Sequence, residues 1–212
     1  MSSSTPPEFR IIRVSNLDEG VPYRASFAGA YQDIFSEPPY NERFFPSEAQ
    51  GVLRAYLEMP ESIVLLAVRG VAQVVGFGIG TPLRSKPSVT RELRGLIPVA
   101  HTYYMAELGV LSAYRGHGLG RELVRQRIDL IDRTRYTHLA MRTSAVKNAS
   151  YNMYLEMGFE DMGVYMEVPS RRLDGRVTTD RRLFLCKVLA QDDVSPESSD
   201  RRAFGTVGRD LE

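Results

Sequence analysis

The feature that most constrains this chain is an apolar strand that runs into three closely spaced glycines and then into an amphipathic helix. The glycines are Gly116, Gly118 and Gly120. Glycine tolerates positive φ and leaves no Cβ beside a ligand. Free N–H groups then converge at the positive end of the helix dipole, so the segment predicts a phosphate or pyrophosphate site. The simpler alternative is a glycine-rich turn flanked by two solvated arginines, Arg115 and Arg121.

Two common phosphate-binding motifs do not fit these glycines. A Walker loop requires a Gly-Lys pair, which occurs nowhere in the chain. A dinucleotide fingerprint requires the spacing G-x-G-x-x-G at the first strand-to-helix turn. Here the spacing is G-x-G-x-G, and the turn lies in the middle of the chain.

The composition fits one soluble domain. The chain has 212 residues, of which 43% are hydrophobic, and 27 basic against 26 acidic side chains give a formal net charge of +1. That balance argues against a protein that coats nucleic acid or an anionic membrane. The longest apolar run, residues 63–68, is far shorter than the roughly 18 residues of a membrane span.

Cysteine and histidine usage predicts neither a disulfide nor a metal site. Cys186 is the single cysteine, and its apolar neighbours predict a small core residue. His101, His117 and His138 lie on three different predicted elements, without metal-ligand spacing. The first residues lack the basic and apolar regions of a secretory signal, so we expect a cytoplasmic protein.

The chain divides into one domain and two loose ends. Residues 1–8 and the Ser/Asp-rich, acidic tail at 190–212 are predicted to be disordered, which leaves a domain at 9–189. Its hydrophobic pattern predicts a strand, two helices, three strands, a helix, a strand, a helix and two strands. Ser47 and Gln50 suggest a capping box at the second helix. Residues 81–100 and 169–182 are expected to be irregular.

The strand–helix–strand unit from 103 to 143 fixes part of the topology. Its crossover requires the two strands to be parallel, whereas the other strands can pair through hairpins. We therefore predict an α/β (α+β) fold with a mixed sheet of about seven strands and about four flanking helices.

Two linked motifs resemble the GNAT superfamily of acyl-CoA-dependent N-acetyltransferases. The family pattern Arg/Gln-x-x-Gly-x-Gly/Ala is present as Arg115-Gly116-His117-Gly118-Leu119-Gly120, and the preceding strand reads Leu108-x-Val110-x-Ser112-x-Tyr114, with serine in place of the usual proline. A second family element, a tyrosine four residues before a Gly-Phe pair, is present as Tyr154 before Gly158-Phe159. The resemblance implies the GNAT fold, in which the two parallel central strands, 103–111 and 138–143, splay apart.

The resemblance also implies acetyl-CoA, or another acyl-CoA, as co-substrate and requires no metal. The backbone of Leu108 and Val110 would pair with the pantetheine arm. The pyrophosphate would be held by the amides of Arg115, Gly116, His117, Gly118, Leu119, Gly120 and Arg121. Asn148, one residue out of the family's usual register, and Tyr151 would complete the cofactor site.

Acyl transfer to an amine requires a base, an oxyanion donor and an acid. A lysine-like amine has a pKa of about 10.4, so it must lose a proton before it attacks. Glu107 is the sole carboxylate on the central strand, and it would act as the base directly or through water; the alternative is a structural ion pair. By resemblance, Tyr154 is the acid, or else it packs on CoA, and the N–H of Val110 is the oxyanion donor.

Two segments expected to border the acceptor point to opposite acceptor charges. Residues 35–45 combine four aromatic side chains with Glu37 and Glu42, which suits a cationic small molecule, unless the aromatics only staple the core. Residues 169–182 hold five arginines, which suit an acidic acceptor or form a solvated loop. One of Tyr103 and Tyr104 is also expected to face the acceptor.

The implied function is transfer of an acetyl or other acyl group to a primary amine of a small molecule, by direct attack through a tetrahedral intermediate. One alternative is acetylation of a protein lysine or N-terminal amine. Another is a non-catalytic, acyl-CoA-binding regulatory domain. Neither nucleic acid nor a membrane is expected as a partner, and a homodimer is compatible with the resemblance.

Overall fold

The computed structural model describes residues 8–189. The predicted disordered ends, 1–8 and 190–212, lie outside the described residues except for Glu8. No helix within 8–189 has the length and hydropathy needed to cross a membrane.

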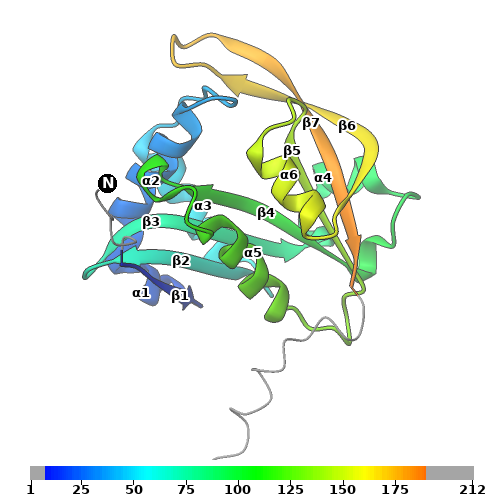
Figure 1. Cartoon of the computed structure of the whole chain (residues 1–212), viewed down its shortest axis with the longest axis horizontal. Helices are drawn as coiled ribbons and strands as arrows, with labels where there is room; N and C mark the ends of the chain where they lie inside the picture. Colours follow the sequence, from blue (N-terminus) through cyan, green and yellow to red (C-terminus); the bar gives the residue numbers. More distant parts are fainter. Residues whose placement is uncertain (1–7, 190–212) are drawn as a thin grey trace, which may run out of the picture.

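Within residues 8–189, seven strands form one mixed sheet in the order β1-β2-β3-β4-β5-β7-β6 (Figure 1). They are β1 (Arg10–Val14), β2 (Ile63–Arg69), β3 (Gln73–Pro82), β4 (Thr102–Val110), β5 (His138–Ser144), β6 (Glu160–Arg171) and β7 (Val177–Val188). Among these seven described strands, only β4 and β5 pair in parallel, and all other neighbours are antiparallel. The predicted mixed sheet and its parallel central pair are confirmed.

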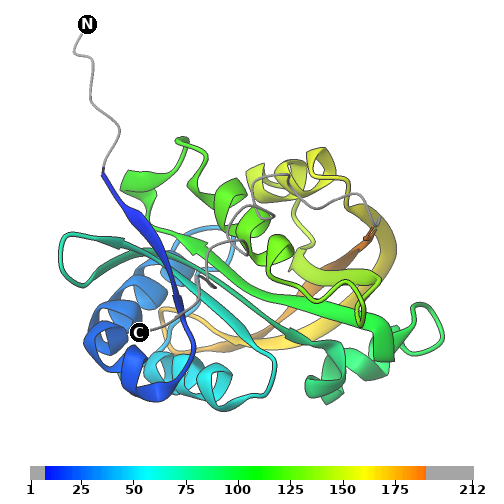
Figure 2. The ribbon, with the colours of Figure 1, turned by 90° about the horizontal axis from the view of Figure 1, so that it is seen from below.

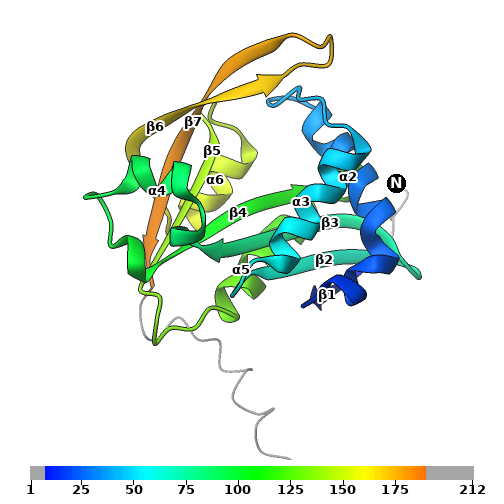
Figure 3. The same ribbon diagram turned by 180° about the vertical axis from the view of Figure 1, so that it is seen from behind.

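Helices cover both faces of this sheet (Figures 2 and 3). The helices are α1 (Leu17–Gly20), α2 (Arg24–Ser36), α3 (Pro46–Glu58), α4 (Pro87–Leu93), α5 (Leu119–Asp129) and α6 (Ala149–Glu156). Helices α2 and α3 share an apolar core with β2 and β3 on one face, and α5 and α6 contribute to a second core on the other. The central strands therefore lie between two apolar layers.

Local sequence signals explain where the helices begin and end. Helix α2 buries Phe27, Tyr31 and Ile34, as its periodicity predicts, and stops before two prolines. Helix α3 begins at Pro46, and the Glu48 carboxylate accepts a 2.7 Å hydrogen bond from the N–H of Phe45. The predicted capping box at Ser47 and Gln50 is therefore wrong, because proline already fits the first helical position.

Two segments predicted to be irregular contain regular structure. Between 81 and 100 the chain completes β3 and forms α4, whose Val89 and Leu93 are buried against the sheet. From 169 to 182, strands β6 and β7 continue into a long hairpin that reaches the connection between α2 and α3 (Figure 1). Its polar side chains concealed it from a hydrophobic-pattern search.

The central pair β4 and β5 separates after a short stretch of pairing. Parallel partners are recorded only from Thr102 to Tyr104 on β4, opposite His138 to Ala140 on β5. A bulge in β4 lies directly after that stretch, because three steps on β4 (Tyr104 to Glu107) oppose two on β3 (Ile79 to Thr81). Bulges bend a strand and increase its twist, so this one directs the rest of β4 away from β5.

Candidate active site

The gap between β4 and β5 leads into two cavities. A cavity of about 520 Å³, here called the loop cavity, lies between the end of β4, the glycine turn and the start of α6. A cavity of about 280 Å³, here called the central cavity, lies beside the bulge and between the two strands. Both are lined by Tyr40, Leu108 and Ser150, so the two cavities meet at these residues.

The glycine turn has the backbone shape that its sequence predicts. Gly116 and Gly118 have φ of 78° and 80°, and Gly118 is the N-cap of α5. A Cβ on either glycine would meet no atom within 4 Å, so backbone conformation alone requires glycine there. The N–H groups of Leu119, Gly120 and Arg121 lie in the first helical turn and have no intrahelical acceptor. They are available to an anion in the loop cavity.

The two arginines beside the turn are held by acids. Arg115 forms a 2.5 Å ion pair with Glu37, and its Nε donates to the carbonyl of Val110 at 2.9 Å. Arg121 is paired with Glu156 of α6. These acids offset the added positive charge, so the anion site depends chiefly on backbone amides. His117, the loop residue between the first two glycines, is exposed.

The backbone of β4 points into the gap at the two predicted positions. The N–H of Leu111 donates to Val75 of β3 at 3.0 Å. Alternate residues of a strand direct their backbone groups to opposite sides, so Leu108 and Val110 direct theirs toward β5. Beyond Tyr104 no pairing with β5 is recorded, which leaves this edge open to an added extended chain.

Asn148 and Tyr151 have different surroundings. Asn148 lines the loop cavity and caps α6, since its Oδ1 accepts from the N–H of Tyr151 at 3.1 Å. The Tyr151 ring is buried in the core, and its hydroxyl donates to Asp161 of β6 at 3.0 Å. Tyr151 lines neither cavity, so its position does not support the predicted cofactor contact.

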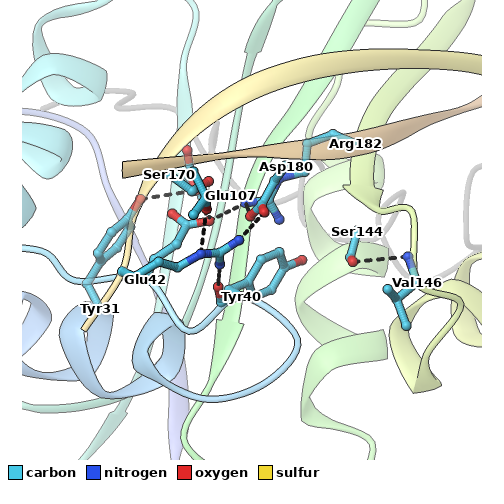
Figure 4. Close-up of polar contacts among 11 residues, drawn as sticks. Tyr31, Tyr40, Glu42, Glu107, Ser144, Val146, Ser170, Asp180 and Arg182 are labelled. Atoms are coloured by element: carbon cyan, nitrogen blue, oxygen red, sulfur yellow. Dashed lines mark hydrogen bonds and ion pairs between the residues drawn. The ribbon is translucent and has the colours of Figure 1, made fainter. Parts of the chain in front are cut away.

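Glu107 follows the bulge, and its carboxylate faces α2 and α3. The hydroxyl of Tyr31 donates to one oxygen at 3.5 Å and that of Tyr56 to the other at 3.4 Å (Figure 4 shows the first). Burial raises the pKa of Glu107, and the charges of Lys86 and Arg142 oppose this rise without cancelling it. No ion pair of Glu107 is recorded among residues 8–189. The carboxylate is thus held by neutral donors, and it lines the central cavity.

Tyr154 enters the same cavity from α6. Its side chain is buried and packs edge-on against Phe159 with ring centroids 5.4 Å apart. Burial raises the pKa of Tyr154 to about 12, although the charge of Arg127 acts in the opposite direction. Glu107 and Tyr154 both line the central cavity, which places a carboxylate and a protonated phenol around one space.

Arg127 of α5 is fully buried behind this pair. Its Nη1 donates to the carbonyls of Ile79 at 2.8 Å and Glu107 at 3.0 Å, and so ties α5 to both strands at the bulge. A Cβ on Gly78 would lie 2.8 Å from Arg127 Nε, so this glycine provides room for the guanidinium. Burial lowers the pKa of Arg127.

The long hairpin closes one side of the central cavity. Arg182 of β7 is paired with Glu42, whose carboxylate also accepts from Ser170 (Figure 4). The N–H of Arg43 donates to the carbonyl of Arg171 at 2.8 Å, so backbone contacts reinforce the ion pair. The connection between α2 and α3 is thereby fastened to the hairpin above the cavity.

The predicted arginine-rich loop does not offer five free cations. Each of its arginines has a partner: Arg171 with Glu48, Arg172 with Asp180, Arg176 with Asp174, Arg181 over the Tyr165 ring and Arg182 with Glu42. Glu42 of the acidic loop pairs with Arg182, and two of the other arginines pair with acids of the hairpin itself. The opposite charges of the loop and the hairpin therefore do not define two opposite acceptors.

Several other residues differ from expectation or were missed. Tyr103 and Tyr104 line neither cavity, because Tyr103 donates to the carbonyl of Glu61 at 2.7 Å and Tyr104 is buried beside α4. Cys186 is only partly buried. Within 8–189 no group of three or more potential metal ligands occurs. The missed site residues are Tyr31, Tyr56, Lys86, Arg127 and Arg142. Tyr31, Tyr56 and Arg127 carried one signal, because each continues the inward-facing series of its helix, whereas Lys86 and Arg142 carried none.

Comparisons with known proteins agree with this geometry. The sequence profile of the Acetyltransferase (GNAT) family matches residues 27–159. N-acetyltransferase 8F1 of Mus musculus is 25% identical over 148 residues, which cover 68% of this chain and 62% of the mouse protein. N-acetyltransferase 8B of Rattus norvegicus is a second curated relative. The chain spans less than two thirds of the length of both the mouse and the rat protein.

Solved structures share the fold at lower identity. The ribosomal-protein-alanine N-acetyltransferase of Brucella melitensis has a TM-score of 0.60 and 20% identity, over 85% of this chain and 99% of that one. The acetyltransferase yncA of Salmonella typhimurium, solved with its cofactor acetyl-CoA, has a TM-score of 0.54 and 17% identity, over 89% and 98% of the two chains.

Proposed function

Because the chain belongs to the Acetyltransferase (GNAT) family, we propose that it transfers an acetyl or other acyl group from acyl-CoA to a primary amine of a small molecule. The observation that carries this proposal is the junction of the two cavities. The loop cavity offers helix N–H groups for a pyrophosphate, and the central cavity places Glu107 and Tyr154 around one space. A thioester carried along the open edge of β4 would reach that junction.

The residues present suit an acyl-CoA. A pyrophosphate fits the N–H groups of the glycine turn, and the extended pantetheine arm fits the unpaired edge at Leu108 and Val110. The structural neighbour yncA has acetyl-CoA as its cofactor, which supports the same ligand class here. The co-substrate supplies the activated acyl group, and the chain supplies its orientation.

The chain's own groups divide the proton transfers. Glu107 accepts the proton from the acceptor amine, directly or through water, and its raised pKa brings it nearer to neutral pH than an exposed carboxylate. The N–H of Val110 faces the gap, where it can donate to the oxyanion of the tetrahedral intermediate. Tyr154 carries its proton at neutral pH and donates toward the departing thiolate.

A small acceptor is favoured by the closed side of the central cavity. Its volume of about 280 Å³ lies near the lower end of the range for small-molecule sites. The ion pair between Arg182 and Glu42 joins the hairpin to the connection between α2 and α3. A polypeptide acceptor would need an open groove at this place, so the ion pair favours a small acceptor.

The test is release of free CoA thiol from acetyl-CoA with a panel of primary amines, amino sugars and peptides with free N-termini. We expect thiol release with one or more small amines and an increase in Tm with acetyl-CoA alone. Turnover only with peptides would favour protein acetylation. A shift in Tm without turnover of any acceptor would favour a regulatory acyl-CoA-binding domain. Absence of both effects would contradict the proposal.

A further inference from the structure

A row of three polar side chains leads away from the central cavity on the α3 side of the sheet. The hydroxyl of Tyr56 donates to Glu107 Oε1 at 3.4 Å, and Nζ of Lys86 donates to the same hydroxyl at 2.8 Å. Lys86 Nζ also lies 4.6 Å from the centre of the Tyr56 ring. Glu107 lines the central cavity, whereas Tyr56 and Lys86 line neither cavity. The row therefore begins at the cavity and continues beyond its wall.

The three members differ in their access to water. The ring of Tyr56 is buried between α3 and the sheet, and only 4% of its surface is exposed. Lys86 is half-buried in the short segment between β3 and α4, so its ammonium lies between the protein interior and solvent. A proton that leaves Glu107 by this route passes through one buried phenol before it reaches a group near the surface.

We propose that Tyr56 and Lys86 form a proton relay that carries the proton accepted by Glu107 out of the central cavity. This inference rests on the acetyltransferase function proposed above. It adds two residues that lie outside both cavities, and it explains how a partly buried base is regenerated while substrates occupy the cavity.

Each step of the relay conserves protons. Glu107 first takes a proton from the acceptor amine and becomes a neutral carboxylic acid. The Lys86 ammonium releases a proton to water, and its nitrogen then accepts the proton of the Tyr56 hydroxyl as Glu107 passes its own proton to the Tyr56 oxygen. The phenol is thereby restored, Glu107 is again a carboxylate, and Lys86 is again an ammonium. The net result is one proton moved from the amine to solvent.

The partial burial of Lys86 favours the release of its proton. Burial lowers the pKa of Lys86, whereas the negative charge of Glu107 acts in the opposite direction and the positive charge of Arg142 adds to the lowering. Burial raises the pKa of Tyr56, so the phenol stays protonated at rest and passes protons on without storing charge. Tyr104 of β4 is a neutral phenol on the same face.

Tyr31 provides a matched comparison within the same site. It comes from α2 and donates to the other oxygen of Glu107 at 3.5 Å, nearly the same distance as Tyr56. No further hydrogen bond of its hydroxyl is recorded among residues 8–189, so it leads to no second group. Loss of either phenol removes one donor to the carboxylate, but only loss of Tyr56 interrupts the route to Lys86.

The decisive variant is Lys86→Arg. Arginine keeps the positive charge and can donate to Tyr56, but it does not lose its proton at accessible pH. The relay predicts a fall in the plateau kcat of about tenfold or more, with the KM of the acceptor and the ascending limb of the pH profile unchanged. A lysine that acts only through its charge predicts a Lys86→Arg variant equal to wild type.

The experiment measures thiol release from acetyl-CoA between pH 5.5 and 9.5 with the best amine of the panel. Variants Lys86→Arg, Tyr56→Phe and Lys86→Met should all lose kcat, and Lys86→Met should also move the ascending limb to higher pH. Tyr31→Phe, which also alters the cavity wall, shows how far the loss of one donor to Glu107 moves that limb. The acetyl-CoA-induced increase in Tm verifies that each variant folds and binds the co-substrate.

Two failures are distinguishable. If wild type shows no turnover with any amine, the proposed function fails. If wild type turns over but Lys86→Arg retains its plateau kcat, the relay is wrong while the proposed function stands.

Discussion

Replacement of Tyr154 by phenylalanine tests how this site stabilises a departing thiolate. The phenol has a pKa of about 12, because burial outweighs the effect of the nearby Arg127 charge. An alkyl thiol such as that of CoA has a pKa near 8.5. Full proton transfer from Tyr154 to the thiolate is therefore uphill by about 3.5 pKa units, or about 5 kcal/mol.

That imbalance makes Tyr154 a hydrogen-bond donor to the developing thiolate more than a source of a fully transferred proton. A hydrogen bond to a charged group contributes about 1.5–3 kcal/mol. We therefore expect Tyr154→Phe to lower kcat by about 10- to 150-fold. The Kd of acetyl-CoA should change little, because the hydroxyl interacts most strongly with charge that develops only during transfer.

The assay is steady-state thiol release at saturating acetyl-CoA, with the Kd of acetyl-CoA measured by calorimetry. A phenol of pKa about 12 produces no descending limb below pH 10. The wild type could instead show a descending limb of kcat between pH 8 and 9.5 that disappears in Tyr154→Phe. That result would refute the reasoning, because the phenol would then titrate far below the pKa that its burial requires. An unchanged kcat would refute any role of the hydroxyl in transfer.

Three further predictions concern the base Glu107, the glycine turn and the ion pair between Arg182 and Glu42. Glu107→Gln should lower kcat by about 10²- to 10⁴-fold. Folding raises the pKa of the Glu107 carboxyl, so its ionisation destabilises the folded protein as pH rises through that raised pKa. The Tm of Glu107→Gln minus that of wild type should therefore increase from pH 5 to 8. A constant difference would contradict this. Gly118→Ala should lower stability by about 1–2 kcal/mol and weaken acetyl-CoA binding, because position 118 has a φ of 80°. The control Gly51→Ala, in open space within α3, should stabilise the fold by about 0.5–1 kcal/mol. Denaturation measures both changes in stability, and calorimetry measures the affinity for acetyl-CoA. Arg182→Met should cost about 3–5 kcal/mol, because it removes the arginine partner of a Glu42 carboxylate that is only 13% exposed, and adding Glu42→Gln should recover part of the loss.

The glycine turn was predictable because each of its signals is local. Strand, glycine spacing and helix occur within one stretch of chain, and their geometry follows from φ preferences and the helix dipole. The parallel pairing of β4 and β5 was equally predictable, since a crossover connection allows no other direction. Glu107 could be identified because it is the sole carboxylate on that strand.

The surroundings of Glu107 could not be derived in the same way. Tyr31 and Tyr56 fit the apolar faces of their helices, and only the packing of α2 and α3 on the sheet directs both hydroxyls to one carboxylate. Lys86 lies in a segment that had no periodicity to interpret. The bulge that opens the gap is a mismatch between two strands, so it has no signature within β4 alone.

The balance of charge in the central cavity bears on which amine it accepts. Its charged lining residues are two acids and two arginines, and Glu42 is already paired with Arg182. Glu107 then faces the positive charge of Arg142 and, through Tyr56, of Lys86. Such a cavity does not stabilise an additional ammonium group, and its positive neighbours favour the neutral amine that attacks the thioester.

Aromatic surface should therefore select the acceptor more than charge does. One wall of the central cavity is built from Tyr31, Phe35 and Phe44, whose rings contact one another. We expect a monoamine with an apolar body to have a higher kcat/KM than a diamine of equal length, because the second ammonium would enter without a counter-ion. The comparison needs one matched pair of acceptors across a range of salt concentrations. A preference for the diamine that weakens as salt is added would show that a carboxylate is free to bind it, and the charge balance argued from Glu42 and Arg182 would be wrong.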